Sequence, residues 1–268
     1  MSISEKITNI KGRELEFISL EIKENIGIVT INNPPLNILT EQVYTEVGIM
    51  FDYINEVDEV WVVIFRAEGK SYPVGLDAAA FKTNMVTGRQ VESAQIFYQS
   101  TCSVYDCRVP VISAVHGHAL GGGLCYAAGS DFIIAAEGSK FGFPEVNLGV
   151  IGGGAHLPRI VPPMVVRNMM FTGEFITAEE LIKFGGITSI VPREKLDEAA
   201  WEKALELRAK GKLVLRNLKE ALNGQEDYQM DKKNQYDIKH TAIMAKTEDL
   251  LECVNAFLEK RKPVLQGR

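Results

Sequence analysis

The chain has 268 residues, of which 46% are hydrophobic, so it can bury the core of one large domain. Its formal net charge of −6 argues against a nucleic-acid-binding protein, because such a protein needs a basic face. No apolar run reaches the roughly 18–20 residues that cross a bilayer, so no membrane partner is expected. Residues 1–7 lack the apolar centre of a signal peptide and an Arg-rich transit character, which predicts a cytoplasmic protein.

The first third of the chain predicts strands that flank one helix. Residues 17–22 alternate in polarity, and they are followed by a turn at Asn25–Gly27 and a second strand at Ile28–Ile31. Thr40 suits the N-cap of a helix whose first turn is acidic and whose apolar residues recur at helical spacing. Val60–Phe65 is then expected to form a buried strand.

The middle of the chain alternates strands with helices up to about Val191, which indicates a layered α/β architecture. In the loop that follows Glu68, Asp77 is expected to cap a new helix. Further elements are expected as a helix at 90–107, a strand at 109–115, short strands at 131–135 and 139–142, and a helix after the glycine-rich segment 149–154.

Three consecutive glycines, Gly121 to Gly123, follow the strand at 109–115 and precede small apolar residues that can continue as a helix. A strand, a tight turn and a helix start leave backbone N–H groups without partners, and the helix dipole adds partial positive charge there. Such a place binds an anion, or stabilises an oxygen on which negative charge develops during a reaction. A turn that serves only close packing is equally compatible with the glycines alone.

After about residue 195 the strands stop, and only helices are expected. They cover 195–211, 213–223, about 232–246 and 247–260. A basic tail with Lys260 and Lys262 ends the last helix, where it provides either favourable charge at a helix C-terminus or a phosphate contact.

The cysteines and histidines indicate no metal site. The four cysteines, which are expected to be reduced, form no CxxC pair and have no metal-ligand spacing. His116 and His118 would share one face of a strand, but nothing of matching type lies nearby to complete a site. No metal is therefore expected.

Three motifs occur in order: the loop Gly75–Asp77, the turn Gly117–Gly123, and the segment Phe141–Gly149, which precedes a second glycine cluster. This set resembles the crotonase family of enoyl-CoA hydratases and isomerases over nearly the whole chain. The resemblance implies a spiral of ββα units over residues 1–195 and a helical C-terminal region, 196–268, that builds homotrimers, usually paired into homohexamers. It also implies an acyl-CoA thioester as the substrate, so that coenzyme A is part of the substrate and no separate cofactor is expected.

In that family, two backbone N–H groups hold the thioester oxygen as it becomes an enolate. By residue match, these donors are Leu76 and Gly122. Removing one such donor typically costs on the order of 3 kcal/mol of transition-state stabilisation. The resemblance also predicts substrate contacts for Val74, Gly75, Gly121, Cys125, Gly153, Lys260 and Lys262.

The family's hydratases use two glutamates, of which this sequence keeps one. Glu145 matches the glutamate of the third motif, whereas Cys125 occupies the other position. A thiol with an ordinary pKa of about 8.5 is mostly neutral at pH 7, so Cys125 does not replace a carboxylate. We expect it to be a small buried residue that lines the pocket. The helix start should lower its pKa somewhat, so a reactive thiol is the lesser alternative. His156 is expected to pack among helices, and a contact with the pocket is the lesser alternative.

One glutamate can take a proton from one carbon and return it to another, if an apolar pocket raises its pKa. This pattern resembles the family's double-bond isomerases. We therefore expect an acyl-CoA enzyme of the enoyl-CoA hydratase/isomerase type, with Glu145 as the single acid/base. Alternatives are another crotonase-type reaction (thioester hydrolysis, decarboxylation or C–C cleavage) and a non-catalytic acyl-CoA-binding scaffold.

Overall fold

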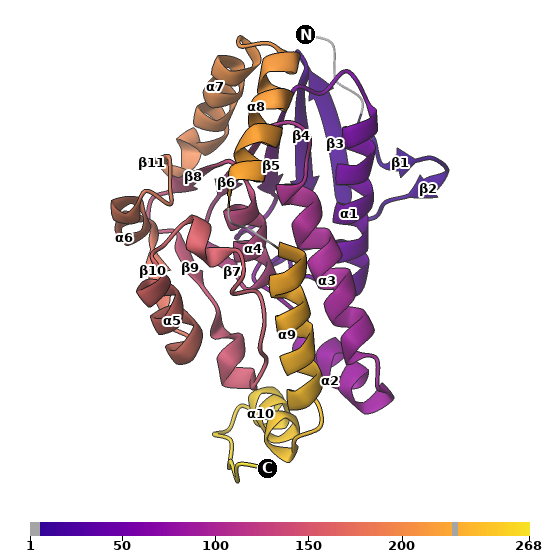
Figure 1. Ribbon diagram of the computed structural model, residues 1–268, viewed down its shortest axis with the longest axis vertical. Coiled ribbons are helices and arrows are strands. Elements are labelled where there is room, and N and C mark those ends of the chain that lie inside the picture. The colour runs from indigo at the N-terminus through magenta and orange to yellow at the C-terminus, as the bar shows by residue number, and fades with distance from the viewer. Residues whose placement is uncertain (1–5, 227–229) are drawn as a thin grey trace.

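A computed structural model describes residues 6–226 and 230–268 (Figure 1). Residues 1–5, which contribute to the expectation of a cytoplasmic protein, lie outside the described residues. Within the described part of the chain, no helix is both long and apolar enough to span a membrane.

Two sheets organise the fold. The larger sheet has the strand order β11-β8-β6-β5-β4-β3, and its strands are parallel except for the antiparallel pair β3–β4. These strands are β3 (Ile18–Lys23), β4 (Ile26–Ile31), β5 (Val62–Ala67), β6 (Val111–Val115), β8 (Phe132–Ala136) and β11 (Ser189–Val191). The smaller sheet contains β10 (Phe175–Thr177), β9 (Lys140–Gly142) and β7 (His118–Leu120), in that order. A separate short pair consists of β1 (Asn9–Ile10) and β2 (Arg13–Glu14).

The helices fall into two sets along the chain. Those that alternate with strands are α1 (Glu41–Glu56), α2 (Ala78–Thr87), α3 (Gln90–Tyr105), α4 (Gly122–Gly129), α5 (Pro163–Thr172) and α6 (Ala178–Leu181). Those that end the chain are α7 (Leu196–Arg208), α8 (Lys212–Gln225), α9 (Met230–Met244) and α10 (Glu248–Leu258). Short 3-10 segments are η1 (Pro144–Leu148), η2 (Leu157–Arg159), η3 (Ile182–Phe184) and η4 (Arg193–Lys195).

The chain repeats a strand in the larger sheet, a strand or bridge in the smaller layer, and a helix. The units β6–β7–α4 and β8–β9–α5 follow this order in full. Earlier in the chain, β4 leads to Leu39 and α1, and β5 leads to Leu76 and α2; Leu39 and Leu76 form a parallel bridge. The expected α/β spiral of ββα units is therefore confirmed.

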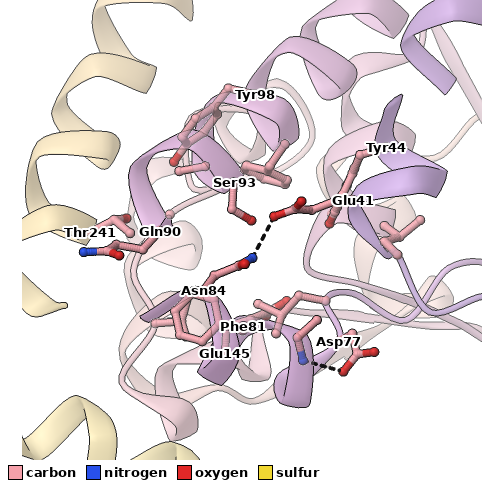
Figure 2. Close-up of a pocket in the computed structure, with 18 of the residues that line it drawn as sticks. Glu41, Tyr44, Asp77, Phe81, Asn84, Gln90, Ser93, Tyr98, Glu145 and Thr241 are labelled. Atoms are coloured by element: carbon pink, nitrogen blue, oxygen red, sulfur yellow. Dashed lines mark hydrogen bonds between the residues drawn. The ribbon is translucent and has the colours of Figure 1, made fainter. Parts of the chain in front are cut away.

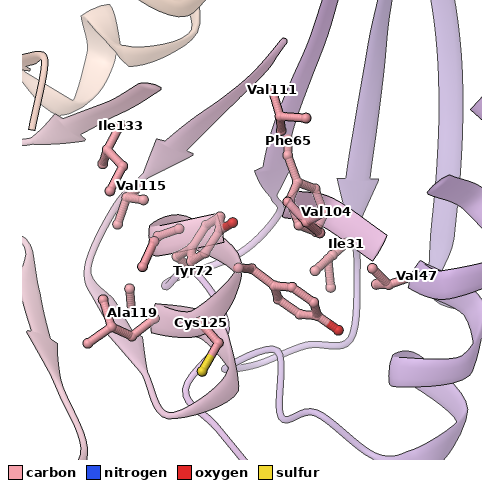
Figure 3. Close-up of a cluster of buried hydrophobic side chains, with 14 of the residues drawn as sticks. Ile31, Val47, Phe65, Tyr72, Val104, Val111, Val115, Ala119, Cys125 and Ile133 are labelled. Atoms are coloured by element: carbon pink, nitrogen blue, oxygen red, sulfur yellow. The ribbon is translucent and has the colours of Figure 1, made fainter. Parts of the chain in front are cut away.

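Alternation along the central strands divides the core into two layers. On β5, Val63 and Phe65 join the cluster packed beneath α1, α3 and α4, which Figure 3 shows in part. Val62 and Ile64 point to the opposite face, where α7 and α8 cover the sheet with side chains such as Leu196. Because successive side chains of a strand point to opposite faces of the sheet, each central strand contributes to both layers. Because α7 packs on β5, β6 and β8, the helical C-terminal region begins as part of the core.

Most predicted elements are confirmed, and the differences are local. The four C-terminal helices, the helix capped by Thr40 and the paired strands near the N-terminus are present. The predicted turn at Asn25–Gly27 is displaced, because Glu24 and Asn25 adopt positive φ and β4 already begins at Ile26. The helix expected directly after residue 154 is wrong: a 3-10 segment with Pro158 stands there, and α5 begins only at Pro163.

Candidate active site

A pocket lies among α1, α2, α3 and the segment η1, and it encloses about 780 Å³ of empty space that is partly open to solvent. Figure 2 shows side chains from these elements converging on it. Its apolar wall consists of Leu39, Tyr44, Leu76, Ala80, Phe81, Ala94, Phe97, Tyr98, Phe143, Val150 and Ile151. Its polar side chains are Thr40, Glu41, Asp77, Asn84, Gln90, Ser93, Glu145 and Thr241. An apolar cavity with a few polar groups is the usual form of a small-molecule site.

The triple-glycine turn packs tightly against the preceding loop. Gly121 has φ +52° and caps α4, whose first residue is Gly122. A Cβ at Gly123 would overlap with the carbonyl oxygen of Pro73, and the amide of Leu120 donates to the same carbonyl at 3.1 Å. Only a residue without a side chain permits this approach of two backbones, which holds the turn and the loop in a fixed relation.

Two backbone amides at this contact remain available. Gly122 is the first residue of α4, so its amide has no acceptor within the helix. Leu76 follows Gly75, whose carbonyl accepts from Leu39 at 2.8 Å. The amide of Leu76 itself donates to no backbone carbonyl among the described residues. Both residues line the pocket, so the structure brings together the two positions that sequence analysis paired.

Glu145 lies in η1, directly after β9, and its carboxyl group lies against the residues that precede those two amides. A Cβ at Gly121 would overlap with Oε1 of Glu145, and one at Gly75 would lie 2.9 Å from the same oxygen. Oε2 is inaccessible to solvent and has no hydrogen-bond partner among the described residues. The carboxyl group therefore stands at the pocket, between the two turns, with one oxygen uncommitted.

Burial raises the pKa of Glu145 from 4.5 to about 7, because the charged form loses its hydration. Its own backbone N–H partly opposes this shift. A carboxyl group with such a pKa exchanges protons readily near neutral pH, as a general acid or base must. Among the nearby apolar residues of the third motif, Phe143 lines the pocket, whereas Phe141 and Leu148 are buried outside its wall.

Cys125 is buried as expected, but it does not line the described pocket wall. It is fully buried in α4, behind the pocket wall, and its Sγ lies 3.5 Å from the carbonyl oxygen of Gly153. The prediction that the helix start lowers its pKa is wrong, because burial, reinforced by the nearby charge of Glu145, raises the pKa of the thiol. A neutral, enclosed thiol is a poor nucleophile.

Gly153 was also predicted to contact substrate, but its amide is hydrogen-bonded to another residue of the protein. Its amide donates to Oδ2 of Asp237 at 3.2 Å, which ties the second glycine cluster to α9. Burial raises the pKa of Asp237, which also interacts with the hydroxyl of Tyr98 on the pocket wall. Sequence analysis missed this acid, because nothing local marks this polar residue of α9 as partly buried.

The remaining predicted residues lie away from the pocket centre. Asp77 caps α2 as expected, accepting from the amides of Ala79 at 2.8 Å and Ala80 at 3.1 Å. Val74 is partly buried and outside the pocket wall, and Lys260 and Lys262 are exposed beyond α10.

His156 is buried, as a packing role predicts, and burial lowers its pKa to about 3. Within the described residues, neither of its ring nitrogens has a hydrogen-bond partner. It is absent from the described pocket wall, so the structure places it in the packed interior.

Glu41, Tyr44 and Asn84 line the pocket without having been singled out as site residues. Glu41 and Tyr44 are three apart on α1 and therefore share one helical face, which is a signal that the sequence does contain. Asn84 donates from Nδ2 to Oε1 of Glu41 at 2.7 Å, a contact between separate helices that local spacing does not reveal (Figure 2).

The chain matches the family model described as "Enoyl-CoA hydratase/isomerase" over residues 21–268. It is 35% identical over 201 residues to a (7aS)-7a-methyl-1,5-dioxo-2,3,5,6,7,7a-hexahydro-1H-indene-carboxyl-CoA hydrolase of Rhodococcus jostii (strain RHA1), a match that covers 75% of this chain and 78% of that protein. It is 31% identical over 260 residues to a carnitinyl-CoA dehydratase of Salmonella enteritidis PT4, which covers 93% of this chain and 99% of that protein. The crystal structure of a carnitinyl-CoA hydratase from Mycobacterium avium has a TM-score of 0.79 at 30% identity, covering 94% of this chain and 98% of the other.

Proposed function

Because the chain belongs to the enoyl-CoA hydratase/isomerase family, also called the crotonase family, we propose that it is an enzyme of the hydratase or isomerase type that stabilises a thioester enolate. The single observation that carries this proposal is the position of the Glu145 carboxyl group against Gly75 and Gly121, beside the amides of Leu76 and Gly122. An acid/base group and two amide donors thus face one pocket.

In the proposed mechanism, the thioester oxygen of a 3-enoyl-CoA accepts hydrogen bonds from the amides of Leu76 and Gly122. Ionised Glu145 removes a proton from the carbon next to the thioester, and the electron pair moves onto that oxygen. The two fixed amide dipoles stabilise the negative charge without having to reorient. Glu145 then returns the proton to the far carbon of the former double bond, which leaves a conjugated 2-enoyl-CoA.

This reaction needs one proton carrier, and this chain has one at the matched positions. Water addition would need a second group to orient the water, and the buried Cys125 thiol with its raised pKa is unsuited to that role. We therefore place isomerisation ahead of hydration. We further propose cytoplasmic action, coenzyme A phosphates held near Lys260 and Lys262, and a homotrimer or homohexamer built through the region 196–268.

The test is the conversion of 3-enoyl-CoA to the conjugated 2-enoyl-CoA by the purified protein, followed by ultraviolet absorbance. Replacing Glu145 by Gln keeps its size but removes the proton carrier, so the rate should fall by about 10²–10⁴-fold. Glu137→Gln, at an exposed acid after β8, is the matched control and should retain full activity. Full activity in the Glu145→Gln variant would show that the assigned role is wrong.

A second candidate, hydrolysis of a CoA thioester, is favoured by the similarity to the Rhodococcus CoA hydrolase. It would use the same amides to stabilise the negative oxygen that forms when water adds to the thioester carbon, before the bond to sulfur breaks and coenzyme A leaves. Assays with hydroxyacyl, malonyl-type and β-keto thioesters, read out as free coenzyme A and as acyl fragments, separate it from isomerisation. A protein that binds these thioesters in calorimetry but converts none of them would instead be a scaffold.

A further inference from the structure

One side of the pocket carries polar groups that the proposed proton transfer does not use. We name Glu41, Asn84, Gln90 and Ser93 the acceptor cluster; they come from α1, α2 and α3 and all line the pocket. In Figure 2, Glu41, Asn84 and Ser93 converge from different helices on the same space. The rest of that wall is apolar, so the cluster is a local feature of the site.

Two oxygens of this cluster still have capacity to accept hydrogen bonds. Glu41 accepts from Nδ2 of Asn84 at 2.7 Å and from Arg89 at 3.3 Å. A carboxylate offers about four acceptor positions, so about half remain. Oε1 of Gln90 is inaccessible to solvent and has no partner among the described residues. A ligand that donates hydrogen bonds would use this spare acceptor capacity.

The charges around the cluster exclude an anionic ligand group. The guanidinium of Arg89 is shared between Glu41 and Glu92 and is 45% exposed, so little positive charge is left to attract a carboxylate. The guanidinium of Arg89 nevertheless lies 3.3 Å from Oε2 of Glu41, so its positive charge opposes a second cation at this carboxylate. A neutral donor, a hydroxyl group, fits both conditions.

We propose that the acyl group of the substrate carries a hydroxyl that donates a hydrogen bond to the acceptor cluster, while its hydrocarbon part packs on Phe81, Phe97 and Tyr44. This substrate class rests on the proposed function of the same pocket. A plain alkyl chain would cover the partly exposed carboxylate of Glu41 and remove its water without replacing it, and it would leave Oε1 of Gln90 unpaired. Sites built around a substrate hydroxyl discriminate against analogues that lack it, because their polar groups are then left unpaired.

The experiment uses the full chain and enoyl-CoA thioesters of equal length, either plain, hydroxylated at successive carbons beyond the double bond, or carboxylated. We define the preference as the kcat/KM for the best hydroxylated thioester divided by that for the plain one. At least a tenfold preference is expected. Equal or faster turnover of the plain chain, or a preference for the carboxylated chain, would overturn the proposal.

Two variants tie the preference to the cluster. Glu41→Gln replaces one acceptor oxygen by a donor, and Gln90→Leu removes the unpaired acceptor at nearly constant volume; each should lower the preference at least threefold. Glu92→Gln is the matched control, because it removes the other partner of Arg89 outside the pocket, and it should leave the preference unchanged. An unchanged preference in both pocket variants contradicts the assignment.

Calorimetric binding of saturated acyl-CoA pairs, hydroxylated and plain, separates this inference from the proposed chemistry. A saturated thioester occupies the pocket without being isomerised. Tighter binding of the hydroxylated thioester together with full activity of Glu145→Gln would sustain the substrate class and refute the mechanism. Loss of activity in Glu145→Gln together with tighter binding of the plain thioester would sustain the mechanism and refute the substrate class.

Discussion

At position 121 even a methyl group would collide with the carboxyl group of Glu145. The same residue has φ +52°, a conformation that residues with a side chain rarely adopt. Only glycine suits this position, because the backbone has a positive φ and the carboxyl group of Glu145 occupies the space that a side chain would need. The amide of Gly122 and the carboxyl group of Glu145 are held beside each other for this reason.

Gly121→Ala should therefore lower activity by at least about 10²-fold, because the methyl group displaces the acid that the proposed mechanism needs. Gly138→Ala is the control, since Gly138 also has positive φ, +71°, but its Cβ would meet nothing within 4 Å. Both variants should lose thermal stability through backbone strain. Comparable activity in the two variants, measured with the same thioester, would mean that the contact with Glu145 is unimportant.

The pH dependence of stability tests the burial of Glu145. Its pKa rises from 4.5 in the unfolded chain to about 7 in the folded protein, so the folded state binds the proton more tightly. The resulting penalty is absent below pH 4.5, grows as the pH rises and is complete above about pH 7, where it amounts to about 3 kcal/mol. Glu145→Gln should thus be more stable than the wild type at pH 8, and the gain should vanish near pH 4. A gain that is independent of pH speaks against a raised pKa.

Single residues were predictable where a motif fixes them. Glu145, Leu76 and Gly122 were identified from three separate motifs, and the structure brings them to one pocket. Cys125 was misplaced because a spacing of three on a helix indicates a shared face without showing which neighbours cover it. Asp237 was missed because its burial depends on Tyr98 and Gly153, which are far from it in sequence.

At the scale of elements, the start of α1 links local sequence to the site. Thr40 caps this helix by accepting from the amide of Val43 at 3.2 Å, and the first turn then presents Glu41 and Tyr44 to the pocket. The cap therefore stabilises α1 and also helps to position these two pocket residues. Thr247 caps α10 in the same way, accepting from the amide of Leu250 at 3.2 Å, but it is absent from the described pocket wall.

Thr40→Ala and Thr247→Ala should each cost about 1 kcal/mol of unfolding free energy, the usual effect of losing a cap. Only Thr40→Ala should also raise KM severalfold, since the first turn of α1 carries pocket residues. Denaturant unfolding and steady-state kinetics on both variants provide the comparison. An equal rise in KM for the two would argue that general loosening, and not the placement of Glu41 and Tyr44, affects the site.

Elements with strong periodicity were predictable, and short ones were not. The central strands and the C-terminal helices have clear periods of two or 3.6 residues. The strand β7, with the three residues His118–Leu120, was missed because so short a segment shows no period, and its existence depends on pairing with β9. Beyond the second glycine cluster, the expected helix begins only at Pro163, as α5, and the three-residue strand β10 was not predicted.

At the scale of the whole molecule, the C-terminal region leaves apolar side chains exposed. On α8, Leu213 is 74% exposed and Leu218 is 52% exposed, and on α10 Phe257 is 56% exposed. Val214, Leu218 and Leu222 are spaced four apart on α8 and are each more than half exposed, and such an apolar stripe favours association with another chain. The sequence predicted this region as helical and assigned it to oligomerisation, and the assembly itself stays a prediction.

Light scattering after size exclusion should give a mass of three or six times 29.7 kDa. Charged substitutions at Leu213 and Leu218 together should shift the mass toward the monomer if α8 contributes to the contact. A monomeric wild-type protein at micromolar concentration would contradict the proposed assembly.

The most direct test of the central claim is hydrogen exchange at the carbon next to the thioester. A saturated acyl-CoA is incubated with the protein in deuterated water, and proton NMR follows the loss of signal at that carbon. Enolate formation between the amides of Leu76 and Gly122, with Glu145 as the base, predicts exchange by the wild type and at least a hundredfold slower exchange by Glu145→Gln. No exchange by the wild type, or equal exchange by the two proteins, would contradict the account.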